Sequence, residues 1–179
     1  MPVKHVLPLG TPSLWEPSAE ATNGPETRQL VDDLHDTLLH WRRTTGYGRG
    51  IAAPQIGLPR RVVVLDLGTR WPMLDPVIED RSPERLVLWD ACLSFLDIFF
   101  TVERHAWIEV SYTDLDGTRH RLRAEDDLSE LLQHEIDHLD GVLALERMSD
   151  VRSMCTRKYF EKHHRAESPY RLEYPGSSP

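Results

Sequence analysis

The segment Leu132–Leu139 constrains this chain more than any other, because it places two histidines four residues apart with a glutamate directly after the first. On an α-helix that spacing puts His134 and His138 on one face, where both imidazoles can bind one metal ion. Glu135 lies beside that face and can exchange protons with water at the metal. The pattern predicts a helix with the chemistry of a water-activating hydrolase. The alternative is a helix whose histidines are ordinary surface or core residues.

The composition excludes several other classes of protein. With 179 residues, of which 40% are apolar and 28% charged, the chain is expected to form one globular domain. Its net charge of −8 argues against direct nucleic-acid recognition and against binding to a membrane surface, since both need a basic footprint. No apolar run approaches membrane-spanning length, and the proline-punctuated N-terminus does not resemble a signal peptide. Cys92 and Cys155 are too few for a disulfide framework, so we expect a cytoplasmic protein.

Hydrophobic periodicity predicts an α+β fold, with antiparallel β-sheets packed around a central metal-binding helix. Helices are expected at three places: an N-terminal helix over 26–44, the metal helix capped by Asp126 or Asp127, and a short C-terminal helix over 149–165. Strands are expected over 61–66, 73–79, 85–88, 106–113 and 118–123, the last two joined by a hairpin turn. We expect one catalytic domain over 1–167 and a loosely ordered tail over 168–179.

A catalytic metal site needs three protein ligands and an open position, so a third ligand must join the two histidines. No third histidine follows at the spacing of the familiar metalloproteases, and Glu146 is expected on the exit from the helix. Cys92 is the remaining soft candidate, against the alternative that it is a buried small hydrophobe. Cys155 has no motif around it, and we assign it to packing on the apolar side of the last helix.

The segment Gly48–Gly57 is rich in glycine and has two possible interpretations. A phosphate-binding loop would need a strand before it and a helix after it. Here a helix is expected before it, and Pro54 argues against a helix directly after it. The other interpretation is a stretch of bare backbone that lets a peptide approach closely, followed by Gln55 aimed into the site.

Taken together, these segments resemble the peptide deformylase family, whose three motifs are G-x-G-x-A-A-x-Q, E-G-C-L-S and H-E-x-D-H in that order. The chain matches the first at Gly48, Gly50, Ala52, Ala53 and Gln55, the second at Cys92, Leu93 and Ser94, and the third at His134, Glu135, Asp137 and His138. The resemblance implies a metal-dependent hydrolase that removes the N-formyl group from the formyl-methionine of nascent polypeptides and releases formate.

The resemblance also implies roles for several of the matched residues. Cys92, His134 and His138 would bind one divalent metal, with ferrous iron as the native ion and zinc, nickel or cobalt able to substitute. Glu135 would be the general acid and base.

Three further positions are implied around the substrate. Gln55 and the backbone N–H of Leu93 would hold the developing oxyanion. Gly50 would pair its backbone with the N-formylated peptide as an added strand.

The second motif departs from the family pattern, since Asp90-Ala91 stands where the family has Glu-Gly. Arg104 stands where the family has an arginine that meets this acid, so a shorter aspartate must come closer to it. The apolar run Phe95–Phe100 replaces a proline-glycine step and would make a more apolar rim.

Two charged residues bear on specificity. Arg49 lies between the glycines of the first motif, where the family has an apolar residue, and Glu130 lies one helical turn before His134. If both point to solvent, which is the interpretation that we favour from sequence, they do not affect specificity. If both line the side-chain pocket as substrate-binding residues, the pocket is more polar than one for methionine.

Two alternatives to a nascent-chain deformylase remain at this stage. One is a specialised deformylase that acts on a non-methionine substrate or a small-molecule intermediate, and the other is a non-catalytic relative that only binds. The basic residues of the last helix could support weak docking on the ribosome, although a solvated charged face suits a short helix in an acidic chain better.

Overall fold

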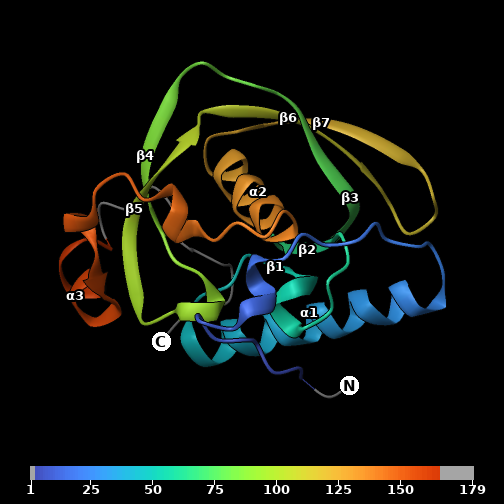
Figure 1. Ribbon diagram of the computed structural model, residues 1–179, viewed down its shortest axis with the longest axis horizontal. Helices are drawn as coiled ribbons and strands as arrows, with labels where there is room; N and C mark the ends of the chain where they lie inside the picture. The colour runs from blue at the N-terminus through green and yellow to red at the C-terminus, as the bar shows by residue number, and fades with distance from the viewer. Residues whose placement is uncertain (1–2, 166–179) are drawn as a thin grey trace.

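The computed structural model describes residues 3–165, and the predicted tail over 168–179 lies outside the described residues. Within them the α+β prediction is confirmed: helix α2 lies between two antiparallel sheets, and α1 runs along the outside of the larger one (Figure 1). The helices are α1 (Pro25–Thr45), α2 (Asp126–Leu139) and α3 (Arg157–His163). The boundary of one catalytic domain at residue 167 stays a prediction.

The larger sheet has the strand order β1-β2-β3-β6-β7, and the smaller one has the order β4-β5-β8. The strands of the larger sheet are β1 (Gly50–Ala52), β2 (Val62–Asp66), β3 (Arg70–Arg81), β6 (Trp107–Thr113) and β7 (Arg119–Glu125). The smaller sheet consists of β4 (Arg85–Asp90), β5 (Ile98–His105) and β8 (Cys155–Thr156). Strand β1 therefore lies at an edge of the larger sheet, with β2 on one side only.

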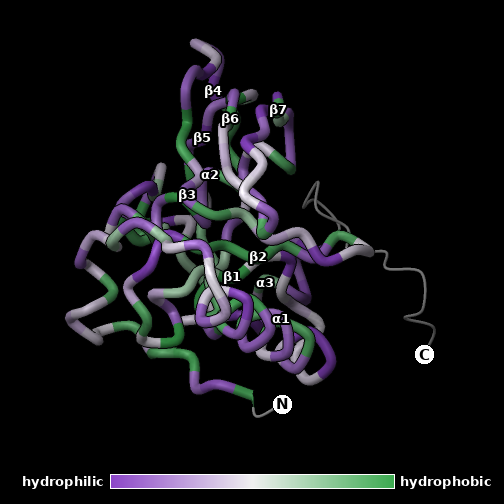
Figure 2. The backbone as a smooth tube through the Cα atoms, turned by 90° about the vertical axis from the view of Figure 1, so that its right-hand side faces the viewer, coloured by the Kyte–Doolittle hydropathy of each residue, from purple (hydrophilic) through white to green (hydrophobic). Residues whose placement is uncertain are grey.

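Strand β2 shows why the chain forms this layered core. Side chains alternate between the faces of a strand, so Val62 and Val64 pack with α1 while Val63 and Leu65 pack with α2. A strand covered by helices on both faces has no polar side to show, which explains its uninterrupted apolar sequence. In Figure 2 the hydrophobic chain segments gather around β1 and β2 above α1.

Glycines and an acidic first turn set the ends of the two long helices. Helix α1 stops at Gly46, whose φ of 78° is the left-handed conformation that glycine adopts without strain. At α2 the predicted cap is wrong: Glu125 occupies the N-cap position without a side-chain cap bond. Asp126 and Asp127 instead form the first turn, where their charge interacts favourably with the helix dipole.

The N-terminal arm ahead of α1 links the three motif segments through backbone hydrogen bonds. The N–H of Leu7 donates to the carbonyl of Gln55 at 2.8 Å, and that of Leu9 donates to the carbonyl of Ser94 at 2.9 Å. The N–H of Ser18 donates to the carbonyl of Leu139, the last residue of α2, at 2.8 Å. The arm thus holds together segments that are far apart in the sequence.

The prediction of one helix over 149–165 is wrong. Its first half forms a short 3-10 turn (Val151–Ser153) and then strand β8, in which Cys155 pairs with Phe99 of β5. The side-chain oxygen of Thr156 then accepts a hydrogen bond from the N–H of Tyr159, so α3 begins only at Arg157. Cys155 is consequently part of a sheet rather than of a helix, and it packs against the core cluster that contains α1 and Phe160.

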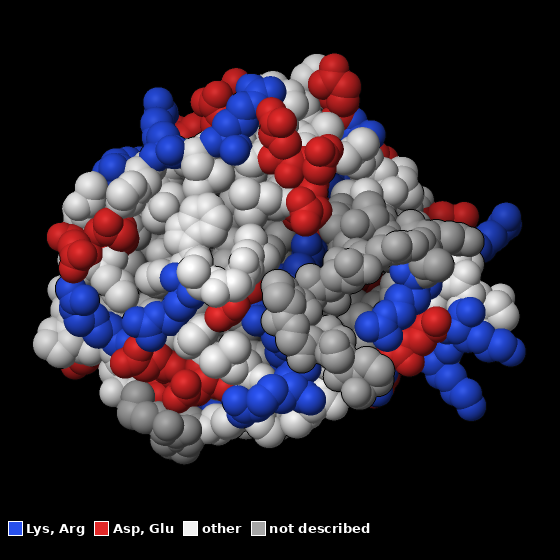
Figure 3. Space-filling view, turned by 180° about the vertical axis from the view of Figure 1, so that it is seen from behind, with Lys and Arg blue, Asp and Glu red and all other residues white. Residues whose placement is uncertain are grey.

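Acidic and basic side chains are intermixed on the face of the molecule shown in Figure 3, without a single large patch of one sign. Among the described residues no helix combines the length and the apolar character that a membrane crossing requires.

Candidate metal centre and active site

One thiol and two imidazoles meet at the centre of the molecule. Cys92 follows β4, while His134 and His138 lie one turn apart on α2, and all three side chains are buried. The Cys92 Sγ lies 3.2 Å from His138 Nε2, and one ligand atom from each of the three residues lies within 4.8 Å of the others. The packing of β4 and its following turn against α2 thus brings together groups that lie more than forty positions apart in the sequence.

The orientation of His134 is fixed by a carboxylate behind it. Its Nδ1 lies 3.0 Å from Asp90 Oδ1, and Arg104 Nη2 lies 3.3 Å from Asp90 Oδ2. Burial alone would raise the pKa of Asp90, but His134 and Arg104 outweigh it and hold that pKa below its usual range. Because the anionic Asp90 accepts a hydrogen bond from Nδ1, the other ring nitrogen of His134 is left to act as a ligand.

The second histidine is set up as a neutral ligand. Burial, and after it the nearby His134, hold the pKa of His138 well below its usual value. A neutral imidazole has a lone pair on one ring nitrogen, and Nε2 is the nitrogen that faces Cys92.

A second group of possible ligands, formed by Asp90, Glu130 and His134, also lies within 4.8 Å. Its members already have protein partners, since Asp90 bonds to His134 and Glu130 bonds to Arg49. The set of one thiol and two imidazoles is therefore the better metal site.

Glu135 lies beside the donor set and lacks a partner for one of its oxygens. It is buried, burial raises the pKa of its carboxyl to about 7, and its Oε2 has no hydrogen-bond partner in the described part of the chain. The backbone of β1 approaches it closely, because a Cβ at Gly50 would lie 2.5 Å from Glu135 Oε1. A side chain at Gly50 would force these neighbouring groups to shift, and the unpartnered oxygen suits a carboxylate that exchanges protons with water.

The amide of Gln55 is held in one orientation. It lies in a 3-10 turn (Ala53–Ile56), and its Oε1 accepts a hydrogen bond from the N–H of Ala52 at 2.9 Å. Its Nε2 is thereby directed at Cys92 Sγ and Ser94 Oγ, each 3.4 Å away. Leu93, between these two residues, lines the same cavity.

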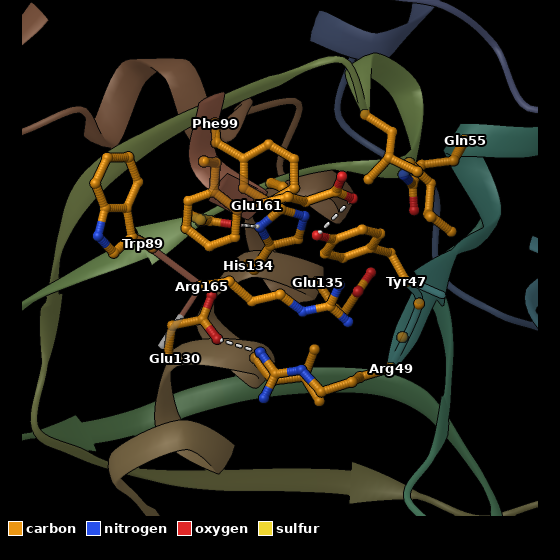
Figure 4. A pocket seen from close by; sticks show the side chains of 18 of the residues that line it. Tyr47, Arg49, Gln55, Trp89, Phe99, Glu130, His134, Glu135, Glu161 and Arg165 are labelled. Atoms are coloured by element: carbon orange, nitrogen blue, oxygen red, sulfur yellow. Dashed lines mark hydrogen bonds and ion pairs between the residues drawn. The ribbon is translucent and has the colours of Figure 1, made fainter. Parts of the chain in front are cut away.

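The cavity has a volume of ≈ 510 Å³ and has two kinds of wall. One wall is aromatic, and in Figure 4 it contains Tyr47, Trp89 and Phe99. The other is charged: Arg49 Nη2 lies 2.7 Å from Glu130 Oε2 and both side chains line the cavity. The interpretation that these two charges point to solvent is therefore wrong.

Two residues that support the site have no role assigned from the sequence. The carboxylate of Asp137 accepts hydrogen bonds from Arg104 and from Arg147, the latter at 2.8 Å, so Arg104 is held between two carboxylates. Asp137 matches the third motif, and its place on the buried face of the metal helix is the signal for a supporting role. Arg147 carries no signal in the sequence, because its role depends on how the chain turns after α2.

The donor set fits a divalent transition metal. A thiolate with two imidazoles suits zinc, iron and similar ions, and three protein ligands leave an open position for water. The unpartnered Oε2 of Glu135 stands next to them. The fold and the site therefore define a metal-dependent hydrolase.

Comparisons with known proteins narrow this class. The family model described as polypeptide deformylase matches residues 3–154. A peptide deformylase of Mesorhizobium japonicum is 36% identical over 180 residues, covering 96% of this chain and 99% of that protein. The chain belongs to the peptide deformylase family.

Solved structures agree with the family assignment. A peptide deformylase from Synechococcus elongatus in complex with actinonin is 31% identical with a TM-score of 0.79, over 86% of this chain and 82% of that one. A class I type b peptide deformylase from Acinetobacter baumannii with Met-Ala-Ser bound is 30% identical with a TM-score of 0.75, over 82% and 99%. The chain is accordingly an enzyme with deformylase activity, and these comparisons support neither of the two alternatives considered from the sequence.

Proposed function

We propose that the chain hydrolyses the N-formyl amide at the start of formylated peptides, including the formyl-methionine of nascent chains, and that Cys92, His134 and His138 hold the metal for this reaction. The observation that carries the proposal is the convergence of these three donors within 4.8 Å beside the buried Glu135. The bound Met-Ala-Ser tripeptide of the Acinetobacter baumannii relative supports a peptide as the substrate. Ferrous iron is the proposed native ion, with zinc, nickel and cobalt as substitutes, because these ligands accept several metals.

When bound, such an ion supplies Lewis acidity, which polarises a carbonyl oxygen and lowers the pKa of water. Glu135 accepts a proton from the attacking water and delivers it to the amine nitrogen as the C–N bond breaks, so formate and a free amino terminus leave. Gln55 Nε2 and the backbone N–H of Leu93 donate hydrogen bonds to the formyl oxygen as its negative charge grows.

Strand β1 is the proposed site for the peptide backbone. It pairs with β2 on one side only, and its first residue, Gly50, lines the cavity together with the preceding Arg49. An extended peptide can add to such an edge through main-chain hydrogen bonds.

The proposed ligand set predicts a spectroscopic result. Protein loaded with cobalt should bind one ion per chain and show thiolate-to-cobalt charge-transfer absorption in the near ultraviolet, because a cysteine sulfur is in the set. Cys92→Ala should lose this absorption and deformylase activity together. Cys155→Ala is the matched control and should keep both, since Cys155 lies in β8, outside the donor set. Absorption that persists in Cys92→Ala would rule out the proposed ligand set.

Removal of the amide donor predicts a kinetic result. Gln55→Ala should lower kcat for a formyl-Met tripeptide by about a hundredfold, the usual effect of one oxyanion donor, with unchanged metal content. Formate release measures the rate. Ser94→Ala, which removes only the hydroxyl 3.4 Å from Gln55 Nε2, should have a smaller effect. Equal losses in the two variants would argue that Gln55 acts through packing instead.

Location and partners remain part of the proposal. A cytoplasmic location agrees with two free cysteines and with a substrate made during translation. Weak ribosome docking through α3 stays a prediction. The seven-residue length of α3 and the approach of Arg157 to Glu161 at 3.9 Å favour a solvated charged face there.

A further inference from the structure

An ion pair forms part of the cavity wall next to the candidate metal centre. Arg49 directly precedes Gly50, and Glu130 lies one turn before His134 on α2. Their side chains meet at 2.7 Å with 16% and 3% of their surfaces exposed (Figure 4). Leu131, also part of the wall, is the next residue along α2.

Stability does not explain an ion pair at this place. A buried pair loses about as much hydration energy as it gains in attraction, and an apolar pair of similar volume is often as stable or more so. Asp127, which approaches Arg49 at 3.9 Å, is 64% exposed and adds little to a buried interaction. The presence of the ion pair is therefore better explained by an interaction with the substrate that enters the cavity.

The position of the pair indicates which part of a substrate it meets. With the formyl group at Cys92, His134 and His138 and the backbone along β1, the first side chain leaves the chain beside Gly50 and Glu135. One helical turn, about 5.4 Å, separates Glu130 from His134, which is roughly the length of a methionine or glutamine side chain. The first side chain of the peptide can thus reach Arg49 and Glu130.

We propose that this ion pair selects N-formyl peptides whose first side chain is neutral and hydrogen-bonding, such as glutamine, over an apolar side chain of the same length. The inference rests on the proposed function. An apolar side chain would cover both charges without replacing their contacts with water. An amide offers an acceptor to Arg49 and a donor to Glu130. A charged side chain would suit one member of the pair and be repelled by the other.

The test compares formyl-Xaa-Ala-Ser peptides in the metal-loaded enzyme by kcat/KM. We expect the glutamine peptide to exceed the norleucine peptide by about tenfold, the effect of one unmade hydrogen bond to a charged group. Glutamate and lysine peptides should fall below glutamine. Formyl-methionine should be cleaved less efficiently than its sulfoxide, which differs from it by one acceptor oxygen. If norleucine equals or exceeds glutamine, the inference is wrong while the proposed function stands. If no formyl peptide is cleaved, the proposed function itself fails.

Removal of the pair as a unit provides the second arm. The double variant Arg49→Met with Glu130→Leu removes both charges of the pair together, and it should reverse the preference so that norleucine exceeds glutamine. The matched control is Arg70→Met with Asp32→Leu, which removes an ion pair of 2.5 Å that does not line the cavity. This control should keep the glutamine preference. An unchanged glutamine-to-norleucine ratio in the Arg49/Glu130 double variant would overturn the proposal.

A milder variant keeps the test decisive if the double variant does not fold. Glu130→Gln keeps the shape and a hydrogen-bond acceptor for Arg49 but leaves the pair with a net positive charge. The formyl-glutamate peptide should then gain several-fold relative to formyl-glutamine. No gain would contradict direct contact between the pair and the side chain.

Discussion

Replacement of Glu135 by glutamine is expected to lower kcat by about a thousandfold or more while the protein still binds one metal ion per chain. Glutamine has nearly the same shape but cannot accept and return a proton, and general acid–base groups contribute about 10²–10⁴-fold to rate. The buried position of Glu135, the rise of its pKa to about 7 and its unpartnered Oε2 suit a proton carrier. Formate release from a formyl-Met tripeptide measures turnover, and metal analysis of the same sample measures binding.

The matched control is Glu109→Gln, a carboxylate on β6 that does not line the cavity. It should keep both activity and metal. If Glu135→Gln retained more than a tenth of the activity, proton transfer would have to be assigned to another group. If it lost the metal as well, the role of Glu135 would be structural.

Substitution of Gly50 by alanine should reduce kcat/KM by about a hundredfold or more. The added Cβ would lie 2.5 Å from Glu135 Oε1 and 2.8 Å from Leu65 Cδ2, so either β1 must move or both side chains must shift. A displacement of about 1 Å at a catalytic group can cost on the order of a hundredfold in rate. Overpacking of the core should also destabilise the fold by about 1–3 kcal/mol. Peptide kinetics and thermal unfolding measure the two effects.

Gly24→Ala provides the control for a simple glycine effect. Its φ of 169° is extended backbone, and no atom of the described chain lies within 4 Å of the added Cβ. Both rate and melting temperature should change little. Wild-type kcat/KM in Gly50→Ala would show that the close approach of β1 to Glu135 is not needed for catalysis.

The parts of the site that sequence predicts well are local. The helical positions of His134, Glu135 and His138 follow from spacing alone, since four residues make about one turn. The double burial of β2 could be expected from its uninterrupted apolar run. The prediction that Cys92 binds the same metal as the histidines depends on the family resemblance, because no local sequence pattern indicates a contact between the turn after β4 and α2.

The sequence predictions that are wrong share one physical cause, which is contact between segments that are distant in the sequence. Residues 149–156 have a helix-like pattern, yet Cys155 is extended because it pairs with Phe99. The sequence does not predict strand β5, because its apolar start suggests a rim of the active site. The segment is a strand because β4 and β8 pair with it on either side. Arg49 and Glu130 were assigned to solvent because charged residues usually are, and their pairing depends on β1 lying beside α2.

The backbone bonds of the N-terminal arm bear on how this enzyme matures during its own synthesis. Leu7, Leu9 and Ser18 leave the ribosome early, but Leu139, the last of their partners, is made late. The contact of Ser18 must therefore wait until α2 has emerged. Segments that depend on such distant pairing are slow to order. The newborn enzyme should consequently complete the attachment of its arm only after α2 has been synthesised.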